Sequence, residues 1–529
     1  MSNRVVDPKV ASTEELAEIE RIVVLVAHIQ QNRTMTTEPL LQAGDVVAIG
    51  RRRTRVTAEF AASLMEGDQV LALSGSGELR RLSKQVVDLV DGSVGRAVRA
   101  FSELSAVSDH AVNHFFDLAA AALLDEDVFS QVQKANIADV ESAQKRGRST
   151  TRLSLTEPMR QDMVSALLMW RDAPMSRDKV VSRLEHAGWS VEELTAPLGV
   201  LGFVFEGRPN VFADATGVLK GGNTVVFRIG SDALGTAHAM MNHVIHPSLH
   251  ASGLPEDAVV LLNSPEHAAG WALFSDSRLS LAVARGSGEA VAELGSIAQQ
   301  SGIPVSLHGT GGAWMIVGES ADARRMGKVV AHSVDRKVCN TLNVICVQKS
   351  LAEIHMPIVL NGLEQAASAR GVRPRIHAVN GAEKFLPPAT TISVRRAEGM
   401  QEELQITASD EESLATEYEW EENPECAIVL VDSIAHAVKL FNLYSPQFIV
   451  SLVSQDEDER SFVWASANAP FVGDGFTRWV DGQFSLLRPE LGLSNWEHGR
   501  LFGRSGILSG DSAFSVRLRV QQTDPELHR

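Results

Sequence analysis

The sequence predicts an α/β protein with a doubly wound parallel sheet and a second α/β domain. Near-continuous apolar runs alternate with helical segments over residues 198–284, and a further α/β stretch covers residues 304–470. Strands that alternate with helices form parallel sheets, which bind nucleotides at the carboxyl ends of their strands. At 529 residues the chain also exceeds what one compact core accommodates, so we expect two or three domains.

In the first α/β stretch, short apolar runs indicate strands that are buried on both faces. Helices are expected over residues 211–219 and 233–244, and Gly221-Gly222-Asn223 is typical of a helix stop. The four expected strands are residues 198–205, 224–228, 258–262 and 279–284.

The second α/β stretch has strand candidates of the same kind, at residues 314–317, 342–347, 427–431 and 448–453. The tail differs, because residues 514–520 alternate strictly between apolar and polar side chains. This pattern predicts a half-exposed strand that is suited to pairing with a neighbouring subunit. We therefore expect a homo-oligomer.

The opening of the chain carries no chemical motif, and we interpret it as a small accessory module. We expect a helix over residues 14–29 and strands over residues 45–50 and 69–73, then scaffold helices to residue 175, one of them over residues 111–124. The expected division is an accessory segment (1–93), a nucleotide-binding domain (94–303), a second α/β domain (304–475) and a C-terminal return segment (476–529).

Composition excludes several classes of protein. A formal net charge of −17 disfavours general nucleic-acid binding. No apolar run approaches the roughly 20 residues of a membrane helix, and the first residues do not form a signal peptide, so we expect a cytoplasmic protein. Three cysteines form no disulfide framework. His243, His246 and His250 have metal-compatible spacing, but Pro247 interrupts any helix that would align them, so we expect no metal.

The segment Val334-Asp335-Arg336-Lys337-Val338-Cys339-Asn340-Thr341 carries the clearest chemical signal. Nearby cations lower a thiol pKa, and the thiolate is the reactive form, so Cys339 beside Arg336 and Lys337 is a candidate nucleophile. The alternative is that Cys339 is a small buried apolar residue, as a lone cysteine commonly is.

Surrounding motifs favour the nucleophile. The segments 197–202 (PLGVLG), 205–211 (FEGRPNV), 219–228 (LKGGNTVVFR), 284–288 (ARGSG), 338–341 (VCNT) and 477–484 (TRWVDGQF) occur in order. Together they resemble the aldehyde dehydrogenase superfamily, and within it the γ-glutamyl phosphate reductase family. The resemblance covers roughly residues 94–525. It implies an aldehyde dehydrogenase-like fold and a soluble, NADP(H)-using oxidoreductase.

The resemblance also implies roles for individual residues. Cys339 would attack an acyl phosphate, and Asn210 would donate its side-chain amide to the carbonyl oxygen. Asn210 suits a helix N-cap equally well. Arg336, Asn340 and Arg478 would lie at the substrate.

On the cofactor side, Arg228 and Ser231 would receive the adenosine ribose and a 2′-phosphate, which favours NADP over NAD. Gly286 and Ser287 would line the pyrophosphate path. Glu417 matches the position that holds the nicotinamide ribose, although its acidic surroundings are equally compatible with a solvated carboxylate.

One absence indicates the direction of the chemistry. Oxidative aldehyde dehydrogenases keep a glutamate before a Gly-Gly pair as the base that activates water. Here the run is Leu307-His308-Gly309-Thr310-Gly311-Gly312, with Gly309 at that place. Hydrolysis of a thioester should therefore be slow, and reduction of an activated acyl group is favoured. His308 is either a substitute base or a structural residue.

The chain also departs from the reductase family on the substrate side. The nucleophile segment lacks the usual Arg-Pro, and the late His-Ala-Arg-Gly-Pro motif is degraded over residues 497–503. We expect reduction of an acyl phosphate, by default L-glutamate 5-phosphate, with a carboxyl kinase as a possible partner. The alternatives are another activated acid or aldehyde in a specialised pathway, or a non-catalytic subunit that retains the fold.

Overall fold

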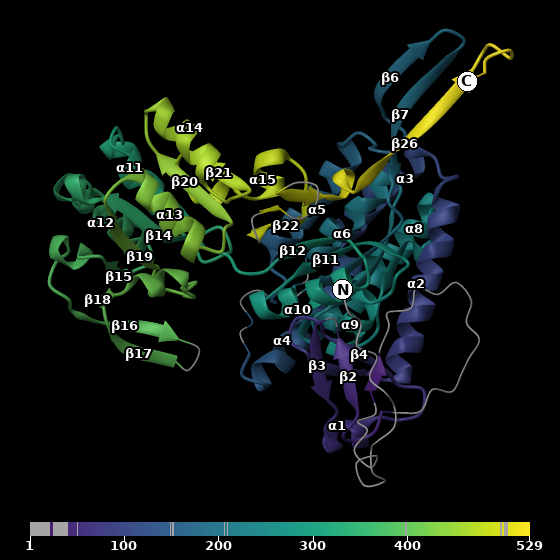
Figure 1. Ribbon diagram of the computed structural model, residues 1–529, viewed down its shortest axis with the longest axis horizontal. Helices are drawn as coiled ribbons and strands as arrows, with labels where there is room; N and C mark the ends of the chain where they lie inside the picture. The colour runs from purple at the N-terminus through teal and green to yellow at the C-terminus, as the bar shows by residue number, and fades with distance from the viewer. Residues whose placement is uncertain are drawn as a thin grey trace, which may run out of the picture.

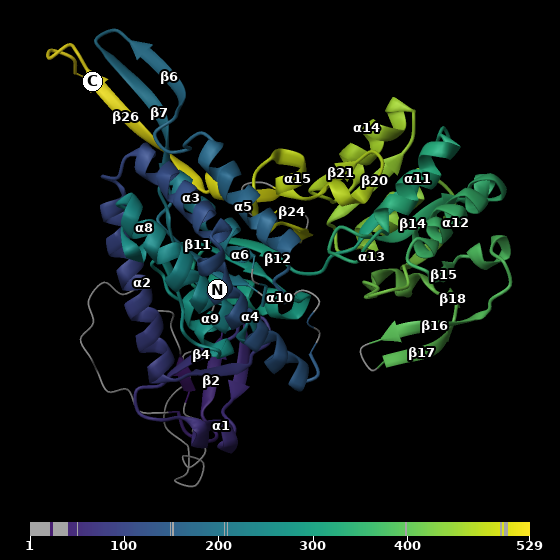
Figure 2. The same cartoon turned by 180° about the vertical axis from the view of Figure 1, so that it is seen from behind.

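The computed structural model describes residues 22–24, 41–49, 51–148, 150, 153–205, 207–208, 210–396, 399–497, 500–501 and 506–528. Two α/β lobes, each around its own sheet, lie side by side, and a narrow three-stranded arm projects from the first lobe (Figure 1, Figure 2). The expected fold class is confirmed. None of the described helices is long and apolar enough to cross a membrane.

The first lobe contains a five-stranded parallel sheet. Its strands, in sheet order, are β10 (Val259–Leu261), β9 (Thr224–Ile229), β8 (Val200–Phe205), β11 (Leu279–Arg285) and β12 (Val305–His308). The four expected strands are all present, because apolar side chains fill both faces. β12 was not expected, and it carries this sheet to His308, past the expected domain boundary at residues 303 and 304.

Helices cover both faces of this sheet (Figure 1). They are α2 (Lys84–Leu104), α3 (Asp109–Leu124), α4 (Glu126–Lys145), α5 (Glu157–Asp172), α6 (Val211–Thr216), α7 (Leu234–Met240), α8 (His246–Ser252), α9 (His267–Phe274) and α10 (Gly288–Gln300). The first lobe also contains three short 3-10 turns: η2 (Gly217–Gly221), η3 (Ser231–Ala233) and η5 (Glu256–Ala258). The helix expected over residues 211–219 is divided into α6 and η2, and the predicted stop is confirmed at the end of η2, where Gly222 adopts a φ of 76°, which favours glycine.

Pro247 does not break the helical path as expected. A π-turn, η4 (Met241–Ile245), joins α7 to α8, and Pro247 lies in the first turn of α8, where a missing N–H costs nothing. The three histidines therefore share a helical segment. Among the described residues, however, no group of three His, Cys, Asp or Glu side chains could hold a metal ion.

The second lobe contains a seven-stranded parallel sheet. In sheet order the strands are β18 (Ile406–Ser409), β15 (Arg375–Val379), β19 (Glu425–Val431), β14 (Leu342–Gln348), β13 (Ala313–Val317), β20 (Ile449–Val453) and β21 (Phe471–Gly473). The four predicted strands form its centre. The unpredicted ones, β18, β15 and β21, lie at its margins.

The remaining elements of this lobe surround the sheet. They are α11 (Ala323–Ser333), η6 (Lys349–Leu351), α12 (Ala352–Ser368), η7 (Ala382–Phe385), the hairpin β16 (Thr391–Arg396) and β17 (Gly399–Leu404), η8 (Glu411–Ala415), α13 (Ile434–Tyr444) and α14 (Glu457–Ser466). The return segment adds η9 (Thr477–Trp479), α15 (Gly482–Leu486), β22 (Glu490–Leu493), β23 (Trp496–Glu497), β24 (Arg500–Leu501), β25 (Ile507–Ser509) and η10 (Gly510–Ser512).

The tail strand β26 (Phe514–Gln522) pairs antiparallel with β7 (Trp189–Pro197), which in turn pairs with β6 (Val180–His186). The predicted strand is thus present, but along one edge its partner belongs to the same chain. Val516, Leu518 and Val520 remain exposed on the arm. Pairing with another subunit stays a prediction.

The accessory module lies against the first lobe (Figure 1). It contains β1 (Ile22–Val24), β2 (Val46–Ile49), β3 (Arg52–Arg55), α1 (Ala58–Ser63), β4 (Gln69–Ala72) and β5 (Leu79–Leu82). Both predicted strands are confirmed. The predicted helix over residues 14–29 is wrong where it can be compared, because residues 22–24 form a strand paired with β2. The rest of that segment lies outside the described residues.

Candidate active site

Cys339 lies in the loop that leads into β14, pressed against the glycine turn after β12. Gly312 N donates a hydrogen bond to Cys339 O at 2.8 Å. A Cβ atom built on Gly311 would come within 2.7 Å of Cys339 Cα, so a side chain there would displace the cysteine. Cys339 is half-buried, whereas Cys346 and Cys426 are fully buried inside β14 and β19. Cys339 alone therefore combines access with a fixed position.

The electrostatic environment of the thiol differs from the prediction. Burial raises the pKa of Cys339, and the charge of Glu490 raises it further, while Arg285 and Arg208 oppose this shift. Arg336, an expected source of positive charge, is exposed. The other, Lys337, is paired with a carboxylate. The prediction that these two neighbours lower the thiol pKa was wrong; more distant arginines have that role.

Arg285, Asp214 and Glu490 form a buried charged cluster near Cys339, which the sequence did not reveal. Arg285, at the end of β11, places its Nη1 3.3 Å from Asp214 Oδ2 on α6 and its Nη2 3.5 Å from Glu490 Oε1 on β22. Burial raises the pKa of Asp214 to about 7 despite Arg285, and burial also raises the pKa of Glu490. These carboxylates therefore retain protons more readily than exposed ones do.

Asn210 occupies the N-cap position of α6, but its side chain makes no capping hydrogen bond. It is half-buried. Capping, the alternative explanation for this asparagine, therefore has no support in the structure. Its role as a donor to a substrate oxygen stays a prediction.

Asn340 and Arg478 support the nucleophile segment. Asn340 Nδ2 donates to Val480 O at 2.7 Å, and its Oδ1 accepts from Arg478. Arg478 Nε donates to Asp335 Oδ1 at 2.8 Å. The two side chains thus join the loop before β14 to η9, and their expected contact with substrate stays a prediction.

The cofactor-side residues gather at the carboxyl ends of the first sheet. Arg228, the penultimate residue of β9, is only 6% exposed. Its Nη2 donates to Pro265 O at 3.1 Å, and its buried Nε has no partner among the described residues. Burial lowers the pKa of Arg228. Ser231 follows in η3, while Gly286 and Ser287 form the turn from β11 into α10. A buried cation with a spare donor and a helix N-terminus fit the phosphates of a dinucleotide.

Glu417 is not a solvated carboxylate. Its Oε2 accepts from Gly311 N at 2.8 Å, and its Oε1 lies 2.6 Å from Lys337 Nζ. Lys337 keeps only 5% of its side chain exposed. Glu417 is therefore part of the site beside Cys339, and Lys337 is a site residue that the sequence did not assign.

The ring of His308 is engaged in structural contacts. Its Nδ1 donates to Leu493 O at 3.0 Å, and its ring packs against Phe448. Burial, with the nearby arginines, lowers the pKa of His308 to about 3. A Cβ on Gly309 would lie 3.1 Å from Gly288 Cα, so a larger residue could not enter without displacing backbone.

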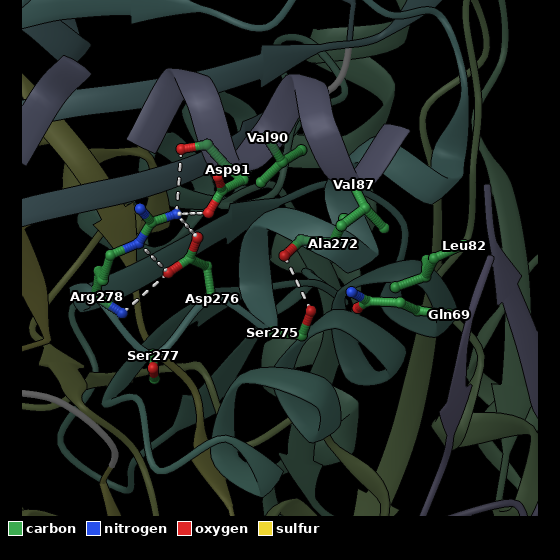
Figure 3. Close-up of a pocket in the computed structure, with 10 residues that line it drawn as sticks. All are labelled: Gln69, Leu82, Val87, Val90, Asp91, Ala272, Ser275, Asp276, Ser277 and Arg278. Atoms are coloured by element: carbon green, nitrogen blue, oxygen red, sulfur yellow. Dashed lines mark hydrogen bonds and ion pairs between the residues drawn. The ribbon is translucent and has the colours of Figure 1, made fainter. Parts of the chain in front are cut away.

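A separate cavity of about 600 Å³ lies between the accessory module and the first lobe (Figure 3). It is lined by Arg278, which forms ion pairs with Asp91 and Asp276, and by apolar side chains such as Leu82. The cavity adjoins the amino end of β11, opposite the end that carries Arg285. It is therefore not the candidate active site.

Comparisons with known proteins agree with this geometry. The model of the aldehyde dehydrogenase family matches residues 210–377. The chain is 28% identical over 380 residues to the γ-glutamyl phosphate reductase of Dictyoglomus thermophilum, covering 70% of this chain and 84% of that one. It is 26% identical to that of Rhizobium johnstonii, covering 83% and 98%. The chain is therefore similar to proteins of the aldehyde dehydrogenase superfamily over most of its length.

Solved structures of the superfamily share the fold. γ-Glutamyl phosphate reductase from Thermotoga maritima superimposes with a TM-score of 0.71 at 21% identity, covering 84% of this chain and 100% of that one. A propionaldehyde dehydrogenase from Rhodopseudomonas palustris, with bound CoA and an acylated cysteine, gives 0.57 at 14% identity, covering 82% and 97%. Enzymes of the superfamily use NAD or NADP, which agrees with the cofactor-side residues described above.

Proposed function

We propose that this member of the superfamily is a cytoplasmic reductase that converts an acyl phosphate to an aldehyde with NADPH. By default the substrate is L-glutamate 5-phosphate and the product L-glutamate 5-semialdehyde, a step of proline biosynthesis. The observation that carries the proposal is a fixed, accessible Cys339, with Gly309 at the place where oxidative enzymes keep the glutamate that activates water. The distant similarity to γ-glutamyl phosphate reductases supports the choice of substrate.

In the first step, Cys339 attacks the acyl carbon and phosphate leaves, so that a thioester forms on sulfur. The thiol proton leaves with the phosphate. Asn210 Nδ2 donates to the carbonyl oxygen as negative charge develops there. Arg285 and Arg208 contribute positive charge beside Cys339, which favours both the thiolate and the departing phosphate.

The cofactor supplies a hydride when bound, with Arg228 and Ser231 at its adenosine end, Gly286 and Ser287 at the pyrophosphate and Glu417 at the nicotinamide ribose. The thiohemiacetal on Cys339 then collapses to release the aldehyde. Hydrolysis of the thioester is disfavoured, because Gly309 offers no base at the position used by oxidative enzymes and His308, with a pKa of about 3, is a weak one.

The test runs the reaction backwards, with aldehyde and NADP⁺, and measures the initial rate with and without inorganic phosphate. We expect phosphate to accelerate the reaction by roughly 10²–10⁴-fold, because phosphate attacks the thioester without a protein base. A rate indifferent to phosphate would contradict the proposal and indicate an oxidative aldehyde dehydrogenase.

A second candidate is a reductase of another activated acid, supplied by its own carboxyl kinase. The departures on the substrate side favour it, among them the missing Arg-Pro of the nucleophile segment and the degraded motif at residues 497–503, of which 498–499 and 502–503 lie outside the described residues. A panel of enzymatically generated acyl phosphates, assayed for NADPH oxidation, distinguishes the two.

A further inference from the structure

Glu417 lies in the irregular segment between η8 and β19, yet one side chain of the nucleophile strand holds it from both sides. Asn343, the second residue of β14, donates from Nδ2 to Thr416 O at 2.8 Å. Its Oδ1 accepts from Tyr418 N at 3.0 Å. Asn343 is 4% exposed, so both bonds are shielded from water. The two peptide groups that flank Glu417 are therefore fixed by a single amide.

The carboxylate of Glu417 is held as firmly as its backbone. Gly311 N donates to Oε2 at 2.8 Å, and Lys337 Nζ lies 2.6 Å from Oε1. Gly311 is also the glycine against which Cys339 packs. Lys337, Cys339 and Asn343 belong to one stretch of chain, so the nucleophile and Glu417 share the same supports.

Tyr418 adds a third restraint. Its ring stacks on His377 from β15, with ring centroids 4.1 Å apart and planes 5° from parallel. This contact adds a side-chain restraint to the residue that follows Glu417.

We propose that Asn343 and Lys337 are positioning residues that hold Glu417 fixed relative to Cys339, so that NADPH meets a preorganised carboxylate. The inference rests on the proposed role of Glu417 as a contact for the nicotinamide ribose. Immobilising one flexible side chain costs a factor of about two to ten in affinity, and a site that is already ordered avoids that cost.

The test is a double-mutant cycle in which the dissociation constant for NADPH is measured by fluorescence titration of the full-length protein. Glu417→Ala should weaken binding. Asn343→Leu should raise the dissociation constant about two- to tenfold in the wild-type background and not at all beside Glu417→Ala, because Asn343 acts only through Glu417. Lys337→Met should give the same pattern, and it tests the idea independently if the Asn343 variant folds poorly.

Asn442 provides the matched control. Its Nδ2 donates to Ser466 O at 2.9 Å and its Oδ1 accepts from Asn468 N at 2.7 Å, so Asn442→Leu removes the same pair of backbone bonds elsewhere in this lobe. That variant should bind NADPH normally.

The outcomes distinguish the proposed cofactor role of Glu417 from the positioning role of Asn343 and Lys337. If Glu417→Ala leaves NADPH binding intact, the proposed cofactor role of Glu417 fails, and the inference fails with it. If Glu417→Ala weakens binding but the effects of the Asn343 and Lys337 variants add to it fully, the cofactor role stands and the positioning inference is overturned.

Discussion

Arg228→Met should weaken NADPH binding and at the same time stabilise the protein without cofactor. Arg228 is a buried cation that forms no ion pair among the described residues, and its Nε is unpartnered. A nucleotide phosphate would supply the missing charge. Methionine keeps the aliphatic stem, so packing changes little.

The expected magnitudes follow from these contacts. A charge-assisted hydrogen bond contributes roughly 1.5–3 kcal/mol, so the dissociation constant for NADPH should rise about tenfold to a hundredfold. NADH lacks the 2′-phosphate and should be affected much less. A buried, unsatisfied donor costs roughly 1–3 kcal/mol, so the melting temperature without cofactor should rise.

Two titrations and a thermal scan test this reasoning, with Arg278→Met as control. Arg278 belongs to the opposite end of the sheet and is neutralised by Asp91 and Asp276, so its replacement should leave both dissociation constants unchanged. An equal loss of NADPH and NADH binding would refute a role for Arg228 at the 2′-phosphate. A lower melting temperature of Arg228→Met without cofactor would show that the folded protein already compensates the charge of Arg228.

Three further predictions concern the nucleophile. Cys339→Ala should abolish turnover while NADPH binding survives, whereas Cys346→Ala should stay active in the same assays; substantial turnover without Cys339 would remove the covalent mechanism. Glu490→Gln removes the charge that most raises the thiol pKa after burial, so the pH midpoint of iodoacetamide alkylation should fall; an unchanged or higher midpoint would contradict this. Gly311→Ala should lower kcat by about 10²-fold in steady-state assays, since its Cβ would displace the nucleophile, and near-normal kcat would show that the loop yields.

Local chemistry was sufficient to predict the central strands of both sheets and to select a candidate nucleophile. Apolar runs such as residues 224–228 have no stable place except inside a sheet, so β9 follows from composition alone. Cys339 and Gly309 were identified from short motifs, because their roles depend on neighbours in the chain. β15 and β12 escaped prediction because polar side chains interrupt their apolar pattern.

Tertiary structure decided which charges meet. Arg285 and Glu490 are 205 positions apart, and Lys337 and Glu417 are 80 apart, so no local pattern could pair them. The same holds for the hydrogen bond between Asn340 and Arg478, whose expected contact with substrate stays a prediction. The sequence by itself determined the central strands of both sheets and singled out Cys339 as the candidate nucleophile. The packing of the lobes determined the field around that residue, because electrostatic interactions depend on distance in space and not along the chain.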